Sequence, residues 1–420
     1  MERIVIIGSG IAGHSALEAL IEAKNAHTQI ILITEEMGSL YSPCAFPYYL
    51  AGEFPRRNIF LKHLQDYKAF SVLWKTEARA EELDLKNQRV HLQKRSIPYD
   101  RLVLATGSEA ILPSIPGIEK RGVFVLKKLV DLDRIRRATG KKVAVIGAGL
   151  IGVEAAMALR QRGWEVSLFE ILDQVLPQLL DSDMAKKVEA VLVSKGIQVY
   201  LKERVLEIKG KMRVQGVKAE KSEVSADIVI LAIGMKPRSE LAKYSGIKIG
   251  PLGGIWVDNR METSSKNIFA CGDCVESRDP IFGEPLLSLF WYVARAQGKI
   301  AGMNAMRRSV SFEGLHRIAA TELFGQSIYS MGYTEKELTK KGLSPKIWQR
   351  EIRTGAIRLL VWKDRLVGAQ LLNATNILPH LFGGIQYGVL LNDASFVQPE
   401  KTLFSPYPPV WILQRLGIHL

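Results

Sequence analysis

Cysteine and long apolar runs are what this sequence has least of. Its 420 residues include three cysteines, too few for a disulfide framework, so we expect a reducing, cytoplasmic environment. No uninterrupted apolar run reaches the ~18–20 residues of a membrane-spanning helix, so we expect no membrane span. The first apolar segment follows Met1 almost at once and leaves no room for a signal or transit peptide. These absences exclude the disulfide-rich secreted class and the membrane-spanning class.

Acidic residues are also in deficit. The chain carries 57 Lys and Arg against 43 Asp and Glu, which gives a net charge of +14. Nucleic acid, an anionic substrate or an acidic protein partner would each suit such a charge. The densest basic segment, residues 127–142, alternates with acidic residues and is typical of a solvated helix, and no basic motif has interleaved aromatics. We therefore expect no nucleic-acid binding, and the excess extends into residues 301–420, with 14 basic against eight acidic residues.

A glycine-rich segment dominates the middle of the chain. An apolar run at 143–146 leads into Gly147, Gly149 and Gly152, a helix is predicted to Arg162, and a second apolar run ends on Glu170. In such a unit the first glycine allows a tight turn, the second lets a pyrophosphate approach the backbone, and the third lets the helix pack on the strand. The free N–H groups and positive dipole end of the helix then face the phosphates.

The same pattern occurs at the start of the chain. Gly8, Gly10 and Gly13 follow an apolar run, and Glu35 closes the next strand. Two such units usually bind two different dinucleotides, and we expect FAD at the N-terminal one. Glu170 can accept both ribose hydroxyls, and residues 171–173 offer no cation for a 2′-phosphate. The second unit is therefore predicted to bind NAD(H) rather than NADP(H).

Three further strands are predicted to end in turns that approach a dinucleotide. Residues 99–109 end in Ala105-Thr106-Gly107, residues 226–237 repeat that pattern around Gly234, and residues 267–274 lead to Gly272-Asp273. The Asp273 carboxylate would accept a ribityl hydroxyl of FAD. Cys271 and Cys274 form a C-x-x-C, but we favour the Gly-Asp turn over a disulfide, and expect no metal because no second ligand pair exists.

The predicted fold is α/β, with two Rossmann-like dinucleotide-binding domains and a C-terminal α+β interface domain. The FAD-binding domain covers residues 1–112 and 249–310, interrupted by an NAD-binding domain at 113–248, and the interface domain covers 311–420. Further predicted elements are a helix over 285–306, strands over 327–332 and 347–352, a hairpin over 357–369 turning at Lys363-Asp364, a helix over 377–391, and an aromatic, proline-rich tail at 405–411 suited to docking.

Cys44 is the remaining candidate for chemistry. It lies in a proline-containing segment just past the second strand, and a short helix is expected to follow. A helix N-terminus would lower the pKa of a thiol beside the flavin ring and favour the thiolate. The alternative is a buried, unreactive cysteine.

With these motifs in place, the whole chain resembles the FAD-dependent pyridine nucleotide–disulfide oxidoreductases. The segment from Cys44 to Tyr48 is similar to the single-cysteine C-x-x-P-Y segment of coenzyme A disulfide reductases and NADH oxidases, and the paired C-x4-C of glutathione reductase relatives is absent. Glu154 stands where the family carries an acid near the nicotinamide–flavin contact. The resemblance implies catalytic roles for Cys44 and Glu154. The cofactor-binding residues implied by motifs and resemblance together are Gly8, Gly10, Ala12, Gly13, Glu35, Pro43, Ala78, Ala105, Thr106, Gly107, Gly147, Gly149, Leu150, Ile151, Gly152, Glu170, Gly234, Gly272 and Asp273.

Two versions of the activity follow from the resemblance. The stretch Tyr41-Ser42-Pro43 departs from the disulfide-reductase pattern and is similar to the FAD subunits of tungsten aldehyde oxidoreductases and phenylglyoxylate dehydrogenase. This similarity implies an electron-transfer subunit that passes electrons between NAD(H) and an acidic iron–sulfur partner by way of FAD. The alternative is a homodimeric coenzyme A disulfide reductase or NADH oxidase in which Cys44 cycles between oxidation states.

Overall fold

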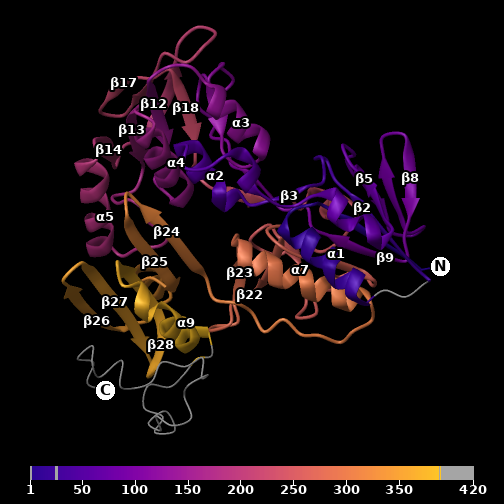
Figure 1. Ribbon diagram of the computed structural model, residues 1–420. Coiled ribbons are helices and arrows are strands. Elements are labelled where there is room, and N and C mark those ends of the chain that lie inside the picture. Colours follow the sequence, from indigo (N-terminus) through magenta and orange to yellow (C-terminus); the bar gives the residue numbers. More distant parts are fainter. Residues whose placement is uncertain (1, 24–26, 387, 389–420) are drawn as a thin grey trace. The chain divides into compact units, whose positions relative to one another are not determined.

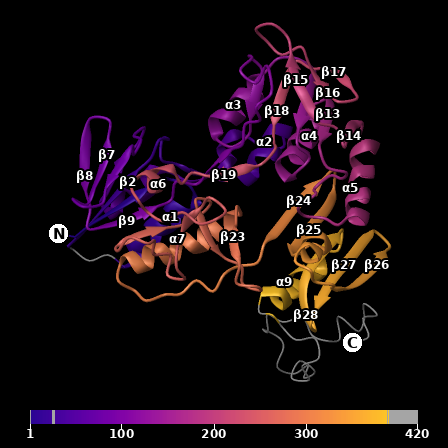
Figure 2. The same ribbon diagram turned by 180° about the vertical axis from the view of Figure 1, so that it is seen from behind.

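The computed structural model describes residues 2–23, 27–386 and 388. The chain divides into two compact units, Met1–Ile111 with Met235–Leu315 and Leu112–Gly234 with His316–Leu420. Each unit contains a five-stranded parallel sheet flanked by helices (Figures 1 and 2). In the described part of the chain, no helix is both long enough and apolar enough to cross a bilayer.

The parallel sheet of the first unit carries the N-terminal glycine turn. Its strands lie in the order β21-β9-β1-β2-β5. They are apolar and mostly buried, as expected of a parallel sheet covered on both faces. Their bounds are β1 (Glu2–Ile7), β2 (Thr28–Ile33), β5 (Val72–Lys75), β9 (Arg101–Leu104) and β21 (Ile268–Ala270).

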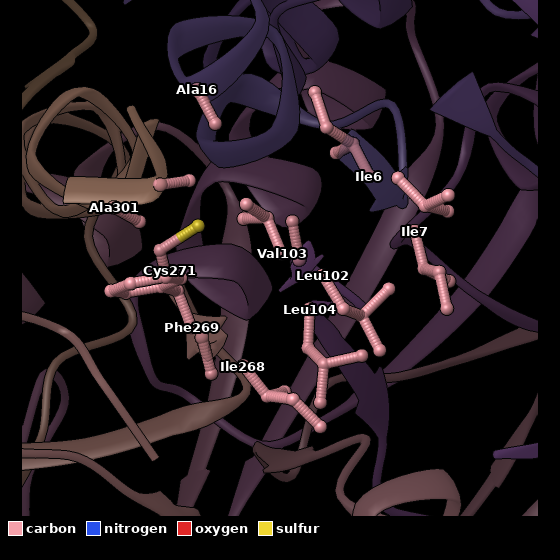
Figure 3. Packing of buried hydrophobic residues seen from close by; sticks show 14 of the residues in the cluster. Ile6, Ile7, Ala16, Leu102, Val103, Leu104, Ile268, Phe269, Cys271 and Ala301 are labelled. Carbon is pink, nitrogen blue, oxygen red and sulfur yellow. The ribbon is translucent and has the colours of Figure 1, made fainter. Parts of the chain in front are cut away.

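Two helices pack together against this sheet. Helix α1 (Ile11–Ala23) and helix α7 (Trp291–Ala305) lie side by side in both views (Figures 1 and 2). The approach is close because Gly298 and Gly302 have no side chain: a Cβ on Gly298 would collide with the carbonyl of Ala12. The core beneath them is shown in Figure 3, which labels Ile6, Ile7, Ala16, Leu102, Val103, Leu104, Ile268, Phe269, Cys271 and Ala301.

Smaller elements complete the first unit. Two three-stranded sheets, β6-β7-β8 and β20-β22-β23, and two two-stranded ribbons, β3-β4 and β10-β19, lie outside the parallel sheet. Their bounds are β3 (Leu40–Tyr41), β4 (Phe60–Lys62), β6 (Glu82–Asp84), β7 (Arg89–Leu92), β8 (Arg95–Pro98), β10 (Ser108–Ala110), β19 (Met235–Pro237), β20 (Ile255–Trp256), β22 (Val275–Arg278) and β23 (Pro285–Leu287), with helices α2 (Phe46–Ala51) and α6 (Glu240–Tyr244) and 3-10 helices η1 (Pro43–Ala45), η2 (Arg56–Ile59) and η3 (Leu64–Phe70).

The second unit repeats the parallel-sheet plan around the second glycine turn. The strand order is β11-β18-β12-β13-β14. A three-stranded antiparallel sheet, β15-β16-β17, is added to it. The bounds are β11 (Val123–Val125), β12 (Lys142–Ile146), β13 (Glu165–Glu170), β14 (Ile197–Leu201), β15 (Val205–Lys209), β16 (Gly216–Ala219), β17 (Glu223–Ser225) and β18 (Ile228–Leu231), with helices α3 (Leu129–Arg137), α4 (Leu150–Gln161) and α5 (Ser182–Ser194).

The C-terminal part of the second unit is an antiparallel sheet of order β24-β25-β28-β27-β26. It is joined to the rest of the unit by Asp181, which accepts hydrogen bonds from Gln370 Nε2 at 2.7 Å and Arg358 Nε at 3.2 Å. The bounds are β24 (Ile318–Leu323), β25 (Gln326–Gly332), β26 (Lys346–Ile352), β27 (Gly355–Trp362) and β28 (Arg365–Leu372), with helices α8 (Glu335–Lys340) and α9 (Leu378–Gln386) and 3-10 helix η4 (Thr375–Ile377).

Most predicted elements are present, and the α/β class with two Rossmann-like sheets is confirmed. The hairpin turns as predicted at Lys363 and Asp364, whose φ angles of +48° and +59° suit a two-residue turn. The predicted start of helix 285–306 is wrong. Pro285–Leu287 is strand β23, paired with β22, and the helix begins at Trp291 because Phe290 is still extended.

The C-terminal predictions are only partly described by the structure. Helix α9 occupies Leu378–Gln386, and the remainder of the predicted helix and the tail at 405–411 lie outside the described residues. The chain passes from one compact unit to the other between residues 111 and 112, 234 and 235, and 315 and 316. Residues 235–248, which we expected within the NAD-binding segment, lie in the first unit because β19 pairs with β10 and the Ser239 hydroxyl donates to the Gly253 carbonyl.

Candidate functional site

The N-terminal glycine turn connects β1 to α1 and forms a cradle. Gly8 has a φ of +112°, and a Cβ there would collide with the carbonyl oxygen of Ala105. A Cβ on Gly13 would collide with the carbonyl of Gly8, so both positions are filled by backbone. A Cβ on Gly10, in contrast, would meet nothing within 4 Å. The one open position lies at the start of α1, where a pyrophosphate would be received.

The second turn, between β12 and α4, has the same construction. Gly147 has a φ of +102° and abuts the Ala232 carbonyl, and Gly152 abuts the carbonyl of Gly147. Gly149 caps α4, and a Cβ on it would again meet nothing within 4 Å. Leu150 and Ile151, which were predicted to bind the cofactor, are the first two residues of that helix. Both turns therefore fit a dinucleotide pyrophosphate.

Further predicted residues gather at the carboxyl edge of the first sheet. The turns at 105–107 and at Gly272-Asp273 follow β9 and β21, and β9 lies between β1 and β21. Ser108 Oγ donates to Asp273 Oδ2 at 2.6 Å, and the Gly272 N–H donates to Gln297 Oε1 at 2.9 Å. These bonds hold Asp273 at the end of the sheet where ligands of open α/β folds bind.

Glu35, at the end of β2, is engaged by an arginine. Arg238 donates to both of its carboxylate oxygens, Nη2 to Oε1 at 2.8 Å and Nη1 to Oε2 at 3.3 Å. Ala78 is bound to the residue before Glu35, because its N–H donates to the Thr34 carbonyl at 2.8 Å. The sequence analysis missed Arg238, because its partner stands 203 positions earlier and no local pattern links the two.

Glu170 occupies the corresponding place in the second unit and is buried at the end of β13. Its carboxylate accepts the Ala148 N–H at 2.8 Å and the Leu172 N–H at 3.0 Å. The predicted ribose acceptor therefore also braces the glycine turn.

Gly234 lies in the turn after β18, the strand that neighbours β12 in the sheet. Its φ of +127° is a backbone conformation that favours glycine.

Glu154 projects from α4 toward the C-terminal sheet of its own unit. Thr321 Oγ1, on β24, donates to Glu154 Oε1 at 2.7 Å. Burial raises the pKa of Glu154 from 4.5 to about 7, and the hydrogen bond from Thr321 opposes part of that rise. A carboxyl group with such a pKa exists in both protonation states near neutral pH, as suits a group that exchanges protons.

Cys44 is exposed in the 3-10 turn Pro43–Ala45, which continues into α2. The burial assumed in the alternative interpretation is therefore not observed. The neighbouring rings of Tyr41 and Phe46 stack with centroids 5.7 Å apart and hold the ends of the segment together. A thiol in this position is accessible to a dissolved or protein-bound partner.

The C-x-x-C pair has the opposite environment. Cys271 and Cys274 are free, fully buried thiols, and Cys274 Sγ lies 3.3 Å from the carbonyl oxygen of Cys271. Burial raises the pKa of both thiols, which disfavours the reactive thiolate. Within the described ranges, no three His, Cys, Asp or Glu side chains are grouped to hold a metal ion.

Comparison with known proteins identifies the family. A family model described as pyridine nucleotide-disulphide oxidoreductase matches residues 2–298. An NADH oxidase of Methanocaldococcus jannaschii is 39% identical over 345 residues, covering 79% of this chain and 76% of the relative. An assimilatory nitrate reductase electron transfer subunit of Bacillus subtilis is 27% identical and covers 97% of this chain but 52% of the relative.

A solved structure agrees with these matches. The NAD-dependent persulfide reductase from A. fulgidus superposes with a TM-score of 0.91 at 29% identity, covering 99% of this chain and 84% of that chain. The expected enzyme class and the expected cofactors, FAD and NAD(H), are confirmed at the level of the family. The chain, with its two open glycine cradles, belongs to the pyridine nucleotide-disulphide oxidoreductase family.

Proposed function

We propose that the first glycine turn holds FAD, that the second holds NAD(H), and that the chain passes electrons between NAD(H) and an acidic iron–sulfur protein. The observation that carries the cofactor assignment is the open space beside Gly10 and Gly149, at matching positions of two turns whose other glycines are packed against backbone. One chain with two such cradles can bring two dinucleotides into a single reaction.

In this proposal the protein residues bind the cofactors and orient them. The helix start after Gly10 receives the pyrophosphate of FAD, Glu35 accepts ribose hydroxyls, and Asp273, held by Ser108, accepts a ribityl hydroxyl. FAD supplies the hydride and electron chemistry when bound. Glu154, whose pKa is about 7, can hold or release a proton near the working pH.

The preference for NAD(H) over NADP(H) rests on the end of β13. Glu170 is an anion that would repel a 2′-phosphate, and the next residues, Ile171, Leu172 and Asp173, provide no cation to bind one. Ribose hydroxyls, which can donate to the carboxylate, are the ligands that this position favours.

An acidic electron partner is supported by the charge distribution. The second unit carries 33 Lys and Arg against 22 Asp and Glu, a net charge of +11, whereas the first unit carries 24 against 21. An uncharged small substrate gives no reason for such an excess, whereas an acidic protein partner does. The electron transfer subunit among the relatives supports the same function class.

A thiol mechanism is the second candidate, and the exposed Cys44 favours it. In that version the Cys44 thiolate attacks one sulfur of a disulfide, or the outer sulfur of a persulfide, and one thiol leaves, so that Cys44 carries a mixed disulfide or a persulfide. Two electrons from NADH and a proton then break the new S–S bond, release the second thiol or hydrogen sulfide, and regenerate the Cys44 thiolate. The persulfide reductase among the similar structures and the NADH oxidase among the relatives support this candidate. A homodimer belongs to this version. A cytoplasmic location belongs to both versions and is supported by the three cysteines, none of which is in a disulfide.

One experiment separates the two candidates. FAD-loaded wild type and Cys44→Ser are reduced anaerobically with NADH and then offered an acidic ferredoxin, coenzyme A disulfide or polysulfide. The electron-transfer proposal expects both proteins to reduce ferredoxin at similar rates. Reduction of the sulfur acceptors alone, lost in Cys44→Ser, would replace it with the thiol mechanism. A wild type whose FAD is not reduced by NADH would contradict both.

A further inference from the structure

Arg238 connects two parts of the proposed FAD site that lie far apart in the sequence. It directly follows strand β19, and its guanidinium faces Glu35 at the end of β2. The two hydrogen bonds, at 2.8 and 3.3 Å, use both carboxylate oxygens. The side chains of Arg238 and Glu35 are 24% and 30% exposed, so the pair is partly shielded from water.

The backbone of Arg238 is fixed as well. Its N–H donates to the Gly107 carbonyl at 2.9 Å, and its carbonyl accepts the Thr106 hydroxyl at 2.6 Å. Thr106 and Gly107 form the turn after β9, next to the glycine turn. Arg238 is thus held at one end by the β9 turn and at the other end holds the carboxylate at the end of β2.

This geometry suits an arginine in particular. A planar guanidinium with a forked set of donors fixes the plane of a carboxylate, whereas a lysine ammonium binds it at one point. Burial lowers the pKa of Arg238 and the bonds to Glu35 raise it, with a net rise, so the guanidinium stays charged. Each carboxylate oxygen can accept more than one hydrogen bond, so this pairing is compatible with ribose binding.

We propose that Arg238 is a positioning residue for FAD, orienting the Glu35 carboxylate for the ribose hydroxyls of the cofactor. The inference rests on the proposed function, in which the first turn holds FAD. It adds that flavin affinity depends on a residue of the β10–β19 ribbon, from which the chain continues into the second unit at residues 111/112 and 234/235.

Two neighbouring cations provide matched controls. Arg79 also forms an ion pair with Glu35, but its Nε is 3.7 Å from Glu35 Oε1 and its side chain is 69% exposed. Lys236 lies on the same ribbon two positions before Arg238, where it pairs with Glu109 at 3.0 Å and is 53% exposed. Replacing either of them by methionine removes one positive charge from this region and leaves the two hydrogen bonds between Arg238 and Glu35 in place.

The test measures FAD binding to flavin-free protein by quenching of flavin fluorescence. We expect Arg238→Met to weaken FAD binding by about 10-fold or more, because a hydrogen-bonded charge pair is lost. Arg238→Lys should be intermediate, and Arg79→Met and Lys236→Met should stay within about 2-fold of wild type, because exposed pairs contribute little. Far-UV circular dichroism and the melting temperature of each flavin-free variant establish that it is folded.

A double-mutant cycle with Glu35→Gln shows whether Arg238 acts through Glu35. If it does, Arg238→Met should cost far less in the Glu35→Gln protein than in wild type, which a merely structural role would not produce. Equal losses in both backgrounds, or no loss in wild type, would overturn the inference. If Arg238→Met is unfolded, Arg238→Lys takes its place in the cycle under the same criteria. FAD binding that is unchanged by Glu35→Gln would also overturn the inference, whereas a Gly10→Val protein that binds FAD like wild type would contradict the assignment of the first turn to FAD.

Discussion

Three glutamates with proposed roles have different environments in the folded chain. Glu35 is bound by a guanidinium, Glu170 accepts two backbone N–H groups, and Glu154 accepts a hydrogen bond from one hydroxyl. Donors that bind the charged form favour ionisation, whereas burial opposes it. The proposed roles follow this division, with Glu35 and Glu170 as ribose acceptors and Glu154 as a group that can exchange a proton.

The raised pKa of Glu154 makes stability depend on pH. The folded protein binds this proton more tightly than the unfolded chain, whose glutamate pKa is 4.5, against about 7 in the fold. The contribution of neutral Glu154 is therefore fully present below pH 4.5 and is lost as pH rises through about 7. Relative to Glu154→Gln, the free energy of unfolding of wild type should fall by about 1–3 kcal/mol over this interval.

Urea denaturation of the two proteins at several pH values measures this difference. Gln can still accept the Thr321 hydroxyl, so Glu154→Gln keeps the contact and removes only the titration. Thr321→Val removes a hydrogen bond that lowers the pKa, so it should move the midpoint upward in pH. Parallel stability curves for wild type and Glu154→Gln would show that this carboxyl does not titrate between those limits.

Glu170 should decide the choice between the two nicotinamide nucleotides. Wild type should use NADH with a kcat/KM at least about 10-fold higher than NADPH, because one charged ribose contact is worth ~1–3 kcal/mol. Glu170→Ala should erode that ratio and also weaken both nucleotides, because the carboxylate braces the turn through Ala148. Asp173→Ala, which removes an exposed carboxylate nearby, is the control and should leave the ratio unchanged. Equal use of both nucleotides by wild type would contradict the assignment.

At the scale of elements, the two glycine turns are equivalent in construction and should differ only in their cofactor. Gly10 and Gly149 do not have positive φ angles, and a Cβ on either would meet no neighbour within 4 Å. A valine at these positions should therefore leave the fold intact and block the pyrophosphate.

Gly10→Val should purify as folded but flavin-poor protein. Gly149→Val should remain yellow, with a raised KM for NADH, because its first turn is untouched. Flavin absorbance, melting temperature and steady-state kinetics measure the three properties. A fully yellow Gly10→Val protein, or a colourless Gly149→Val protein, would show that the cofactors are assigned to the wrong turns.

These elements also show what could be predicted from the sequence. Glycine spacing and apolar runs are local patterns, and they correctly located both turns, most strands and the hairpin at Lys363-Asp364. Strand β23 was missed because its pairing with β22 depends on a partner outside the local pattern, and proline at 285 also suits a helix start. Arg238 and Thr321 escaped notice for the same reason, since each acts on a carboxylate more than 150 positions away.

At the scale of the whole molecule, charge is the least ordinary property of the chain. The net charge of +14 lies mostly in the second unit, at +11. Long-range attraction between such a protein and an acidic partner raises the association rate and is screened by salt. A small uncharged acceptor gains nothing from this attraction.

The most direct test is the salt dependence of ferredoxin reduction by wild type and by Cys44→Ser. The rate with an acidic ferredoxin should fall several-fold between about 50 and 300 mM salt, since screening shortens the Debye length to ~8 Å at physiological ionic strength. An uncharged quinone acceptor should show no such fall, and Cys44→Ser should follow the wild-type curve with ferredoxin. A salt-independent wild type, together with a Cys44→Ser protein inactive towards every acceptor, would contradict the electron-transfer account and leave the thiol mechanism in its place.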